Sequence, residues 1–255
     1  MNRLCLCVLL TLATVCAGGR AAAQTAAAPA AAAKTLPRTA DGRPNLQGIW
    51  QAPKGAATRL APANQIPYLQ AAAATLRANF KDRAKADPLN QCFLPGVPRI
   101  MAMDWPFQIF QTRDAVAMTF EWTQVFRLIH TNGSTHIQGI EFWMGDSRGR
   151  WDGDTFVVNV ANFNDRSWLD ASGNFHSEAM TVVERYTMLD ANSIRYEATV
   201  TDPKVFAKPW TVTIPLRRRT DIDRLLEYQC KAEQSEANGA FERDPKTWYP
   251  GANKK

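Results

Sequence analysis

Residues 143–184 decide the fold, and they read WMGDSRGRWDGDTFVVNVANFNDRSWLDASGNFHSEAMTVVE. Within this stretch the turn Asp152-Gly153-Asp154 separates two runs, and residues 155–163 are rich in Val, Phe and Thr. Short β-branched and aromatic runs bounded by Gly, Asp and Asn are typical of strands. The same stretch holds three of the eight tryptophans and one of the three histidines of the chain. It predicts neighbouring strands joined by a polar connection, residues 164–175.

The same pattern extends on both sides of this stretch. It indicates roughly nine or ten short strands at hairpin spacing, without the alternation of strands and helices that builds parallel sheets. The sequence therefore predicts an all-β fold, an antiparallel barrel with a β-sandwich as the alternative. The other expected strands are residues 45–50, 107–112, 115–122, 125–131, 137–144, 178–189, 193–201, 210–216 and 224–230.

One N-terminal helix is expected over residues 68–86, where apolar residues recur at spacings of three to four. Pro67 stands at its start and Pro88 just beyond its end, which are the positions that proline favours around a helix. Residues 87–99 carry three prolines and a glycine, so we expect an ordered loop there.

The first residues have the features of an export signal. Arg3 precedes the apolar residues 4–17, and Ala21-Ala22-Ala23 offers a cleavage site, so residues 1–23 are predicted to be a signal peptide. The apolar run is shorter than the roughly 20 residues that span a membrane. Lipidation at Cys16 is the less favoured alternative, because Val15 stands where a small residue is wanted. The expected location is the periplasm or the exterior.

Beyond the signal, the sequence predicts a tether over residues 24–44, a single barrel domain over 45–235 and a tail over 236–255. Removal of residues 1–23 lowers the formal charge from +6 to +4, because Arg3 and Arg20 leave. The remaining basic residues are scattered, which argues against a nucleic-acid partner. No later segment is apolar enough to span a membrane, and the oligomeric state is left open.

Two of the five cysteines, Cys92 and Cys230, remain after the signal is removed. An even pair in an oxidising compartment indicates a disulfide. A catalytic cysteine is the weaker alternative, because neither residue stands beside a histidine.

Several strings resemble known families. Gly48-Ile49-Trp50 before a series of strands resembles the opening of the lipocalin-like (calycin) barrels. The strings DPLNQCFLPGVPR, PFQIFQT, HSEAMTVVERY and DPKVFAKPW, with the stretch from residue 143, resemble a family of secreted bacterial proteins across residues 45–232. The resemblance implies secretion, one domain and the disulfide, and it implies no particular reaction.

The main candidate for chemistry is His176 with Asp165 and Glu178. Alternation places His176 and Glu178 at the start of the apolar face that continues along the next strand. An imidazole flanked by carboxylates in a partly apolar mouth suits general acid–base catalysis. Asn164 and Trp168 are expected to hold a substrate. The alternative is a structural network in which His176 binds loop carbonyls and Asp165 caps its own turn.

A second polar set is expected within the strands. Parity turns Arg127 inward, where it needs a carboxylate partner, either Glu121 or Glu184. This set serves either as an internal brace or as a substrate contact. Trp143 is a candidate for lining a flat apolar or sugar-like ligand, although core packing is the usual role of tryptophan.

Two further patterns have simpler explanations. Gly145-Asp146-Ser147-Arg148-Gly149 fits the G-x-S-x-G pattern, but no helix is expected after the serine, as a nucleophile elbow requires. His136 and Glu141 could join His176 and Glu178 around a metal, but their spacing fits no common metal motif. We predict neither a metal nor a cofactor.

These features favour a cofactor-independent enzyme that uses general acid–base chemistry on a small apolar, aromatic or sugar-like substrate, as a lyase, isomerase, cyclase or hydrolase. The alternative is a non-catalytic, lipocalin-like protein of the periplasm that binds a small molecule in the same cavity. A purely structural envelope protein ranks third.

Overall fold

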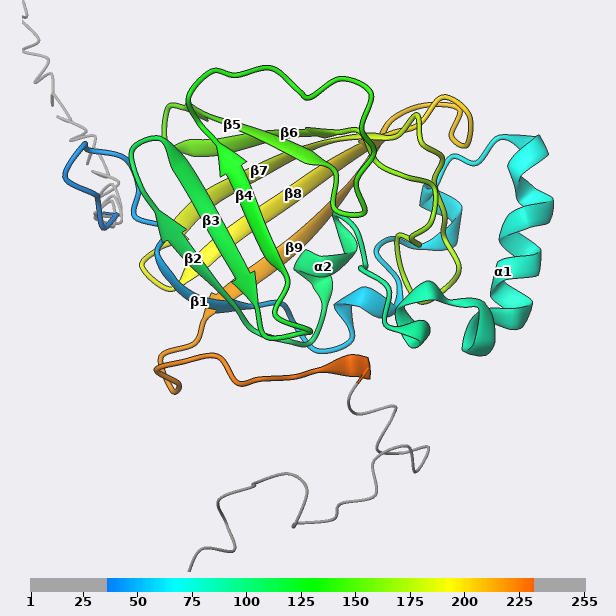
Figure 1. The fold of residues 1–255 in the computed structure, drawn as a ribbon, viewed down its shortest axis with the longest axis horizontal. Helices are drawn as coiled ribbons and strands as arrows, with labels where there is room; N and C mark the ends of the chain where they lie inside the picture. The colour runs from blue at the N-terminus through cyan, green and yellow to red at the C-terminus, as the bar shows by residue number, and fades with distance from the viewer. Residues whose placement is uncertain (1–35, 232–255) are drawn as a thin grey trace, which may run out of the picture. The chain divides into compact units, whose positions relative to one another are not determined.

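Nine strands close into a barrel in the computed structural model, which describes residues 36–231 (Figure 1). Each strand pairs with its neighbours in chain order, and β1 pairs with β9 to complete the ring. This closed barrel confirms the predicted all-β class and excludes the sandwich. The strands are β1 (Gly48–Gln51), β2 (Phe107–Gln111), β3 (Ala115–Phe120), β4 (Phe126–His130), β5 (Asp146–Asp152), β6 (Thr155–Ala161), β7 (Thr181–Asp190), β8 (Ser193–Thr201) and β9 (Trp210–Arg218).

The two ends of the chain lie largely outside this description. The predicted signal peptide, residues 1–23, and the predicted tail, residues 236–255, are outside the described residues, as are residues 24–35 of the predicted tether. The last part of the tether, residues 36–44, makes a turn in which Arg38 and Pro44 form a β-bridge.

The pairing is antiparallel at every junction except one. β4 and β5 run parallel, with Ile129 opposite Ser147 and His130 opposite Arg148, so the prediction of a wholly antiparallel barrel is wrong there. An odd number of strands cannot alternate in direction all the way around a closed ring. At least one parallel junction is therefore required, and the long connection between β4 and β5 provides it.

This junction also corrects one strand prediction and contains one strand that was not predicted. Residues 137–144 form a loop rather than a strand; Ile137 and Ile140 are 44% and 52% exposed, and a single bridge joins Phe142 to Phe163. The strand lies instead at β5, which sequence patterns miss because it is polar. Gly149 lets β5 approach its neighbours, since a Cβ there would lie 2.7 Å from the Phe156 ring and 2.8 Å from Ile129.

Alternating apolar residues fill the barrel. On β8 and β9 the inward faces alternate regularly, because the even-numbered positions from Ile194 to Val200 and from Trp210 to Leu216 are buried. On β7 the inward face begins with Val182 and continues through Glu184 and Tyr186. Large aromatic side chains from several strands meet in this interior, so the barrel is a packed core.

Helices flank the barrel in the first third of the described chain (Figure 1). The predicted helix forms as α1 (Ala73–Ala86), ends as expected before Pro88, and begins later than predicted, because a short 3-10 turn, η3 (Gln70–Ala72), precedes it. The predicted loop over 87–99 contains another 3-10 turn, η4 (Pro88–Gln91). After it, α2 (Arg99–Ala102) packs into the core with all four residues buried. The remaining short 3-10 turns are η1 (Ala56–Thr58) and η2 (Ala63–Gln65).

The chain after β9, residues 219–230, crosses one end of the barrel and is called the strap below (Figure 1). The prediction of a strand over 224–230 is wrong: only Tyr228 forms a β-bridge, with Trp122, and Leu226 is 69% exposed. The predicted disulfide between Cys92 and Cys230 is confirmed, with a Cα–Cα distance of 5.5 Å. It fastens the strap to the segment after η4. Closing so long a loop stabilises by about 5 kcal/mol on the chain-entropy model.

No helix among residues 36–231 is long and apolar enough to cross a bilayer.

Candidate ligand-binding site

His176 lies in the interior of the molecule, where it is 3% exposed. Its Nδ1 is 3.0 Å from the Ser177 carbonyl oxygen, and its Nε2 is 2.9 Å from Ser167 Oγ. Because a carbonyl oxygen only accepts, Nδ1 carries the proton, and Nε2 accepts from the Ser167 hydroxyl. Burial lowers the pKa of His176, against the smaller opposing effects of the Ser177 carbonyl and of the charges on Asp202 and Asp165. The ring is therefore held neutral and fully hydrogen-bonded.

The two carboxylates predicted to act on His176 do not join it in a catalytic arrangement. Glu178 lies in the turn before β7 and forms an ion pair with Lys204 at the surface. Hydrogen bonding to Lys204 lowers the pKa of Glu178. Asp165 is exposed and acts on His176 through its charge alone. Asp202, which was not predicted from the sequence, is a further carboxylate whose charge acts on His176. It accepts hydrogen bonds from the amide and the hydroxyl of Ser177, the residue after His176.

The two residues predicted to hold a substrate beside His176 are also packed into the structure. Asn164 is 8% exposed, and its Oδ1 accepts from the Arg166 amide in a turn. Trp168, also 8% exposed, forms a β-bridge with Phe175. Residues 164–175 form a compact unit with His176 and are called the His176 connection below.

A buried carboxylate organises the His176 connection from within. Asp170 is 0% exposed and accepts hydrogen bonds from the amides of Ser172 and Leu60 and from the Asn174 side chain. Its bond to Leu60 ties the connection to the first part of the chain. These contacts give the polar residues of the connection a structural role.

Arg127 points into the barrel, as parity predicts, and its partner is Glu184. Arg127 binds both oxygens of Glu184 and also donates to Ser147 Oγ, while the hydroxyls of Tyr186 and Tyr196 each donate to Glu184 Oε1 at 2.9 Å. Burial is the largest single influence and disfavours the Arg127 charge, but Glu184, Tyr186 and Tyr196 together outweigh it and raise the pKa of Arg127. Burial raises the pKa of both tyrosines. The cluster is a closed internal brace.

This cluster also explains the G-x-S-x-G pattern. Ser147 is 3% exposed and hydrogen-bonded to Arg127 inside the barrel, and a strand follows it rather than a helix. Trp143 lies elsewhere, stacked on Phe93 with ring centroids 5.2 Å apart. Neither Ser147 nor Trp143 lines the hollow described in the next paragraph.

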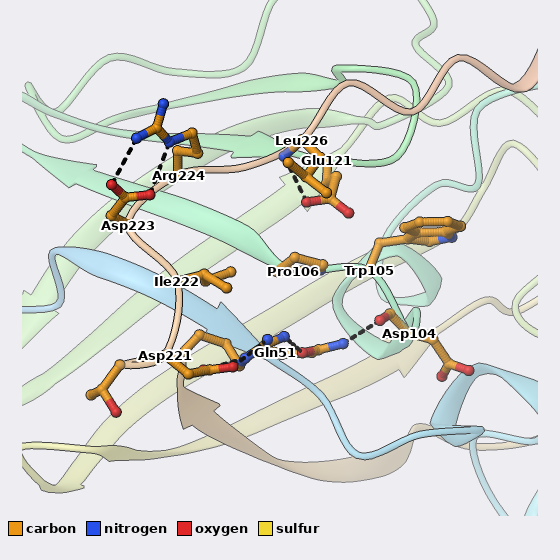
Figure 2. A pocket seen from close by; sticks show the side chains of 12 residues that line it. Gln51, Asp104, Trp105, Pro106, Glu121, Asp221, Ile222, Asp223, Arg224 and Leu226 are labelled. Carbon is orange, nitrogen blue, oxygen red and sulfur yellow. Dashed lines mark hydrogen bonds and ion pairs between the residues drawn. The ribbon is translucent and has the colours of Figure 1, made fainter.

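Glu121 is the predicted site residue that lies at an open cavity. It stands just after β3, is 7% exposed, and lines a hollow of about 650 Å³ under the strap. We call this cavity the strap hollow (Figure 2). Its wall is built from three distant parts of the sequence: Gln51 of β1, residues 104–106 before β2, and strap residues between 219 and 226.

The strap hollow has one apolar wall. Trp105 is half-buried and stacks on Tyr228 with ring centroids 4.2 Å apart, and Pro106 and Leu226 stand near Glu121. Figure 2 shows the Glu121 carboxylate between Leu226 and the Trp105 ring. An apolar wall with a few converging polar groups is the usual composition of a small-molecule site.

Most charges around the strap hollow compensate one another. Arg219 donates to both oxygens of Asp221 and also to Gln51, and it lowers the pKa of Asp221 to about 2. Arg224 pairs with Asp223 at the rim (Figure 2). Glu121 differs from these carboxylates, because it has no ion-pair partner within 4 Å among the described residues.

The sequence predicted Glu121 either as a partner of Arg127 or as a substrate contact, and it did not predict Asp104 and the strap as parts of a site. A weak signal was present in Asp104-Trp105-Pro106, where an acid and an aromatic precede a strand, and in the alternating charges of residues 219–224. Among residues 36–231, no three His, Cys, Asp or Glu side chains are grouped to hold a metal ion.

Compared with known proteins, the chain matches no family model and no curated protein.

Proposed function

We propose that this protein binds a small organic molecule in the strap hollow. The observation that carries the proposal is Glu121: the residue is 7% exposed, yet with Trp105 it lines an open hollow of about 650 Å³. The volume is in the range of ligand sites in proteins, roughly 300–1,000 Å³. A binding role of this kind is the second of the two functions expected from the sequence, moved from the His176 end of the barrel to the strap.

The barrel interior is less suited to a ligand than the strap hollow. Barrels of this architecture hold a ligand when the interior is open. Here Tyr186, Tyr196 and the Arg127–Glu184 pair are each at most 3% exposed and occupy that space with their hydrogen bonds satisfied. A ligand would have to displace this brace, whereas the strap hollow is open.

A thermal-shift screen tests the proposal. Terpenoids, aromatic compounds and sugars would be added to the purified protein, and each hit repeated with Trp105→Leu. A ligand at a hundred times its Kd stabilises by about 2.7 kcal/mol, which is readily measured. We expect hits whose effect is lost in Trp105→Leu and kept in Trp143→Leu, a matched change at the surface stack outside the hollow. Compounds whose thermal shift is unchanged in Trp105→Leu would contradict the proposal.

One observation favours a second candidate, acyl transfer by a serine nucleophile at Ser167. The Ser167 hydroxyl donates to the neutral Nε2 of His176 at 2.9 Å, with Nδ1 oriented by a carbonyl, which is the relation of a nucleophile to its base. Both residues are at most 3% exposed, so the pair would have to open to meet a substrate. Labelling with a fluorophosphonate separates the candidates: modification of Ser167 supports acyl transfer, and an unmodified protein supports binding alone.

We also propose that the chain is exported and belongs with the secreted, calycin-like proteins that its sequence resembles. The Cys92–Cys230 disulfide supports this, because such bonds persist in oxidising compartments. Cell fractionation with N-terminal sequencing is the test. We expect a periplasmic or secreted protein that begins after Ala23; a full-length cytoplasmic chain would contradict export.

A further inference from the structure

We infer that the strap hollow selects organic cations, in which an ammonium group is joined to an aromatic or apolar body. This inference rests on the proposed function and adds the chemical class of the ligand. It follows from the hydrogen-bond partners of Glu121: one carboxylate oxygen has a partner, and the other has none among the described residues.

Glu121 is anchored but incompletely satisfied. Its Oε2 accepts a hydrogen bond from the Leu226 amide at 2.8 Å, and no described residue donates to its Oε1. Glu121 as a residue is 7% exposed, but its Oε1 is not one of the fully buried, unpartnered side-chain atoms of residues 36–231, so this oxygen faces the open hollow. The open oxygen therefore marks the place of a donor from outside the protein.

The cations of the protein near Glu121 are already engaged. Arg219 is held by two hydrogen bonds to Asp221 and one to Gln51, and Arg224 is held by Asp223 (Figure 2). Hydrogen bonding to Asp221 raises the pKa of Arg219, and the charges of Asp221 and Glu121 add to this effect. The negative charge of Glu121 thus extends into the hollow, and a second acid, Asp104, is also among the residues that line it.

The aromatic wall gives the same preference. Trp105 lines the hollow on the side of Glu121 that faces away from Leu226 (Figure 2). The face of an indole ring carries negative partial charge and attracts ammonium groups, while the ring buries the apolar part of a ligand. A neutral or anionic ligand of the same shape would leave the Glu121 oxygen unpaired or repel it.

The test compares three ligands with one body and different head groups: tryptamine, tryptophol and indoleacetate. Binding to the full mature protein would be measured by isothermal titration calorimetry at low and high salt. We expect tryptamine to bind about 10- to 100-fold more tightly than tryptophol, which is the range of one charge-assisted hydrogen bond, and indoleacetate to bind most weakly. High salt should weaken tryptamine more than tryptophol.

Two variants assign the preference to Glu121. Glu121→Gln keeps the acceptor for the Leu226 amide, so the strap stays anchored, and it should bring tryptamine and tryptophol to similar affinity. Glu178→Gln makes the same change at a carboxylate that is paired with Lys204 away from the hollow, and it should keep the preference.

The outcomes separate this inference from the proposed function. If the three ligands bind alike and lose affinity together in Trp105→Leu, the hollow is a binding site but the cation inference is wrong. A preference for tryptamine that survives Glu121→Gln also overturns it. If none of the three binds, the inference is overturned, and the wider screen then decides whether the strap hollow binds any ligand.

Discussion

The His176 connection and the strap hollow are both rich in polar groups, yet they differ in whether those groups have partners. In the connection, His176 has a partner at each ring nitrogen, and Asp170 accepts from three backbone amides and one side chain. At the strap, Glu121 is also buried, at 7% exposure, but only one of its carboxylate oxygens accepts a hydrogen bond from a described residue. Polar residues that crowd together in the sequence can satisfy one another, so crowding alone does not mark a site. A largely buried polar group beside a cavity, with one atom that lacks a hydrogen-bond partner from the protein, is a better indicator of a ligand site.

The largest effect on stability is expected at the Arg127–Glu184 cluster, where the hydrogen bonds of the buried polar groups are most completely satisfied. Arg127→Met leaves the Glu184 charge buried without a cation, and we expect the free energy of unfolding to fall by about 3–5 kcal/mol. Urea denaturation measures it. The double variant with Glu184→Gln should recover much of the loss, because the uncompensated charge is gone. A loss below about 1 kcal/mol for the single change would show that water reaches the cluster.

Within the His176 connection, the expected effect is smaller. Ser167→Ala removes the donor to His176 Nε2 and leaves a buried acceptor unsatisfied, which should cost about 1–3 kcal/mol of stability. Ser172→Ala is the matched control in the same connection, because its hydroxyl bonds to the Thr58 carbonyl near the surface. That control should change stability by about 0.5 kcal/mol or less. Equal effects would mean that burial does not distinguish the two serines.

Sequence patterns predicted those parts of the fold that depend on local alternation. Turn spacing and parity indicated the barrel and the inward direction of Arg127, and Glu184 was one of the two partners considered for it. Parity failed at Glu178, because β7 begins at Thr181 and the residues before it form a turn, which does not alternate. It also missed β5, whose inward positions Ser147 and Gly149 are small or polar.

The strap hollow could not be predicted in the same way. Gln51, Trp105, Glu121 and the strap are far apart in the sequence, and only barrel closure and the disulfide bring them together. The open oxygen of Glu121 is a property of its surroundings, which no local pattern of residues reports. Conversely, the acids around His176 are close in sequence, but Glu178 turns to Lys204.

The pH dependence of stability tests whether His176 is neutral in the folded protein. Burial lowers its pKa in the folded protein, so below about pH 6.5 the unfolded chain binds more protons than the folded one. The stability that neutral His176 confers is present above that pH and is lost as the pH falls through it. We expect a thermal midpoint that drops less steeply between about pH 7.5 and 5.5 in His176→Gln than in the wild type.

Glu178→Gln is the control for that measurement. Lys204 lowers the pKa of Glu178, so this carboxylate keeps its charge across the range, and its loss should leave the slope unchanged. A slope altered by Glu178→Gln would mean that Glu178 and His176 interact after all. An unaltered slope in His176→Gln would contradict the assignment of a buried, neutral imidazole.

The smallest effect on stability is expected where the effect on binding is largest. Without ligand, Glu121→Gln should change the free energy of unfolding by about 0.5 kcal/mol or less, or raise it, because Gln still accepts from the Leu226 amide and the lost charge has no ion-pair partner among the described residues. Denaturation of the ligand-free protein measures this. Residues that serve function are often not optimal for stability, so a neutral or stabilising change fits a binding role. A loss of about 2 kcal/mol or more would make Glu121 a structural brace and remove the difference between the two regions.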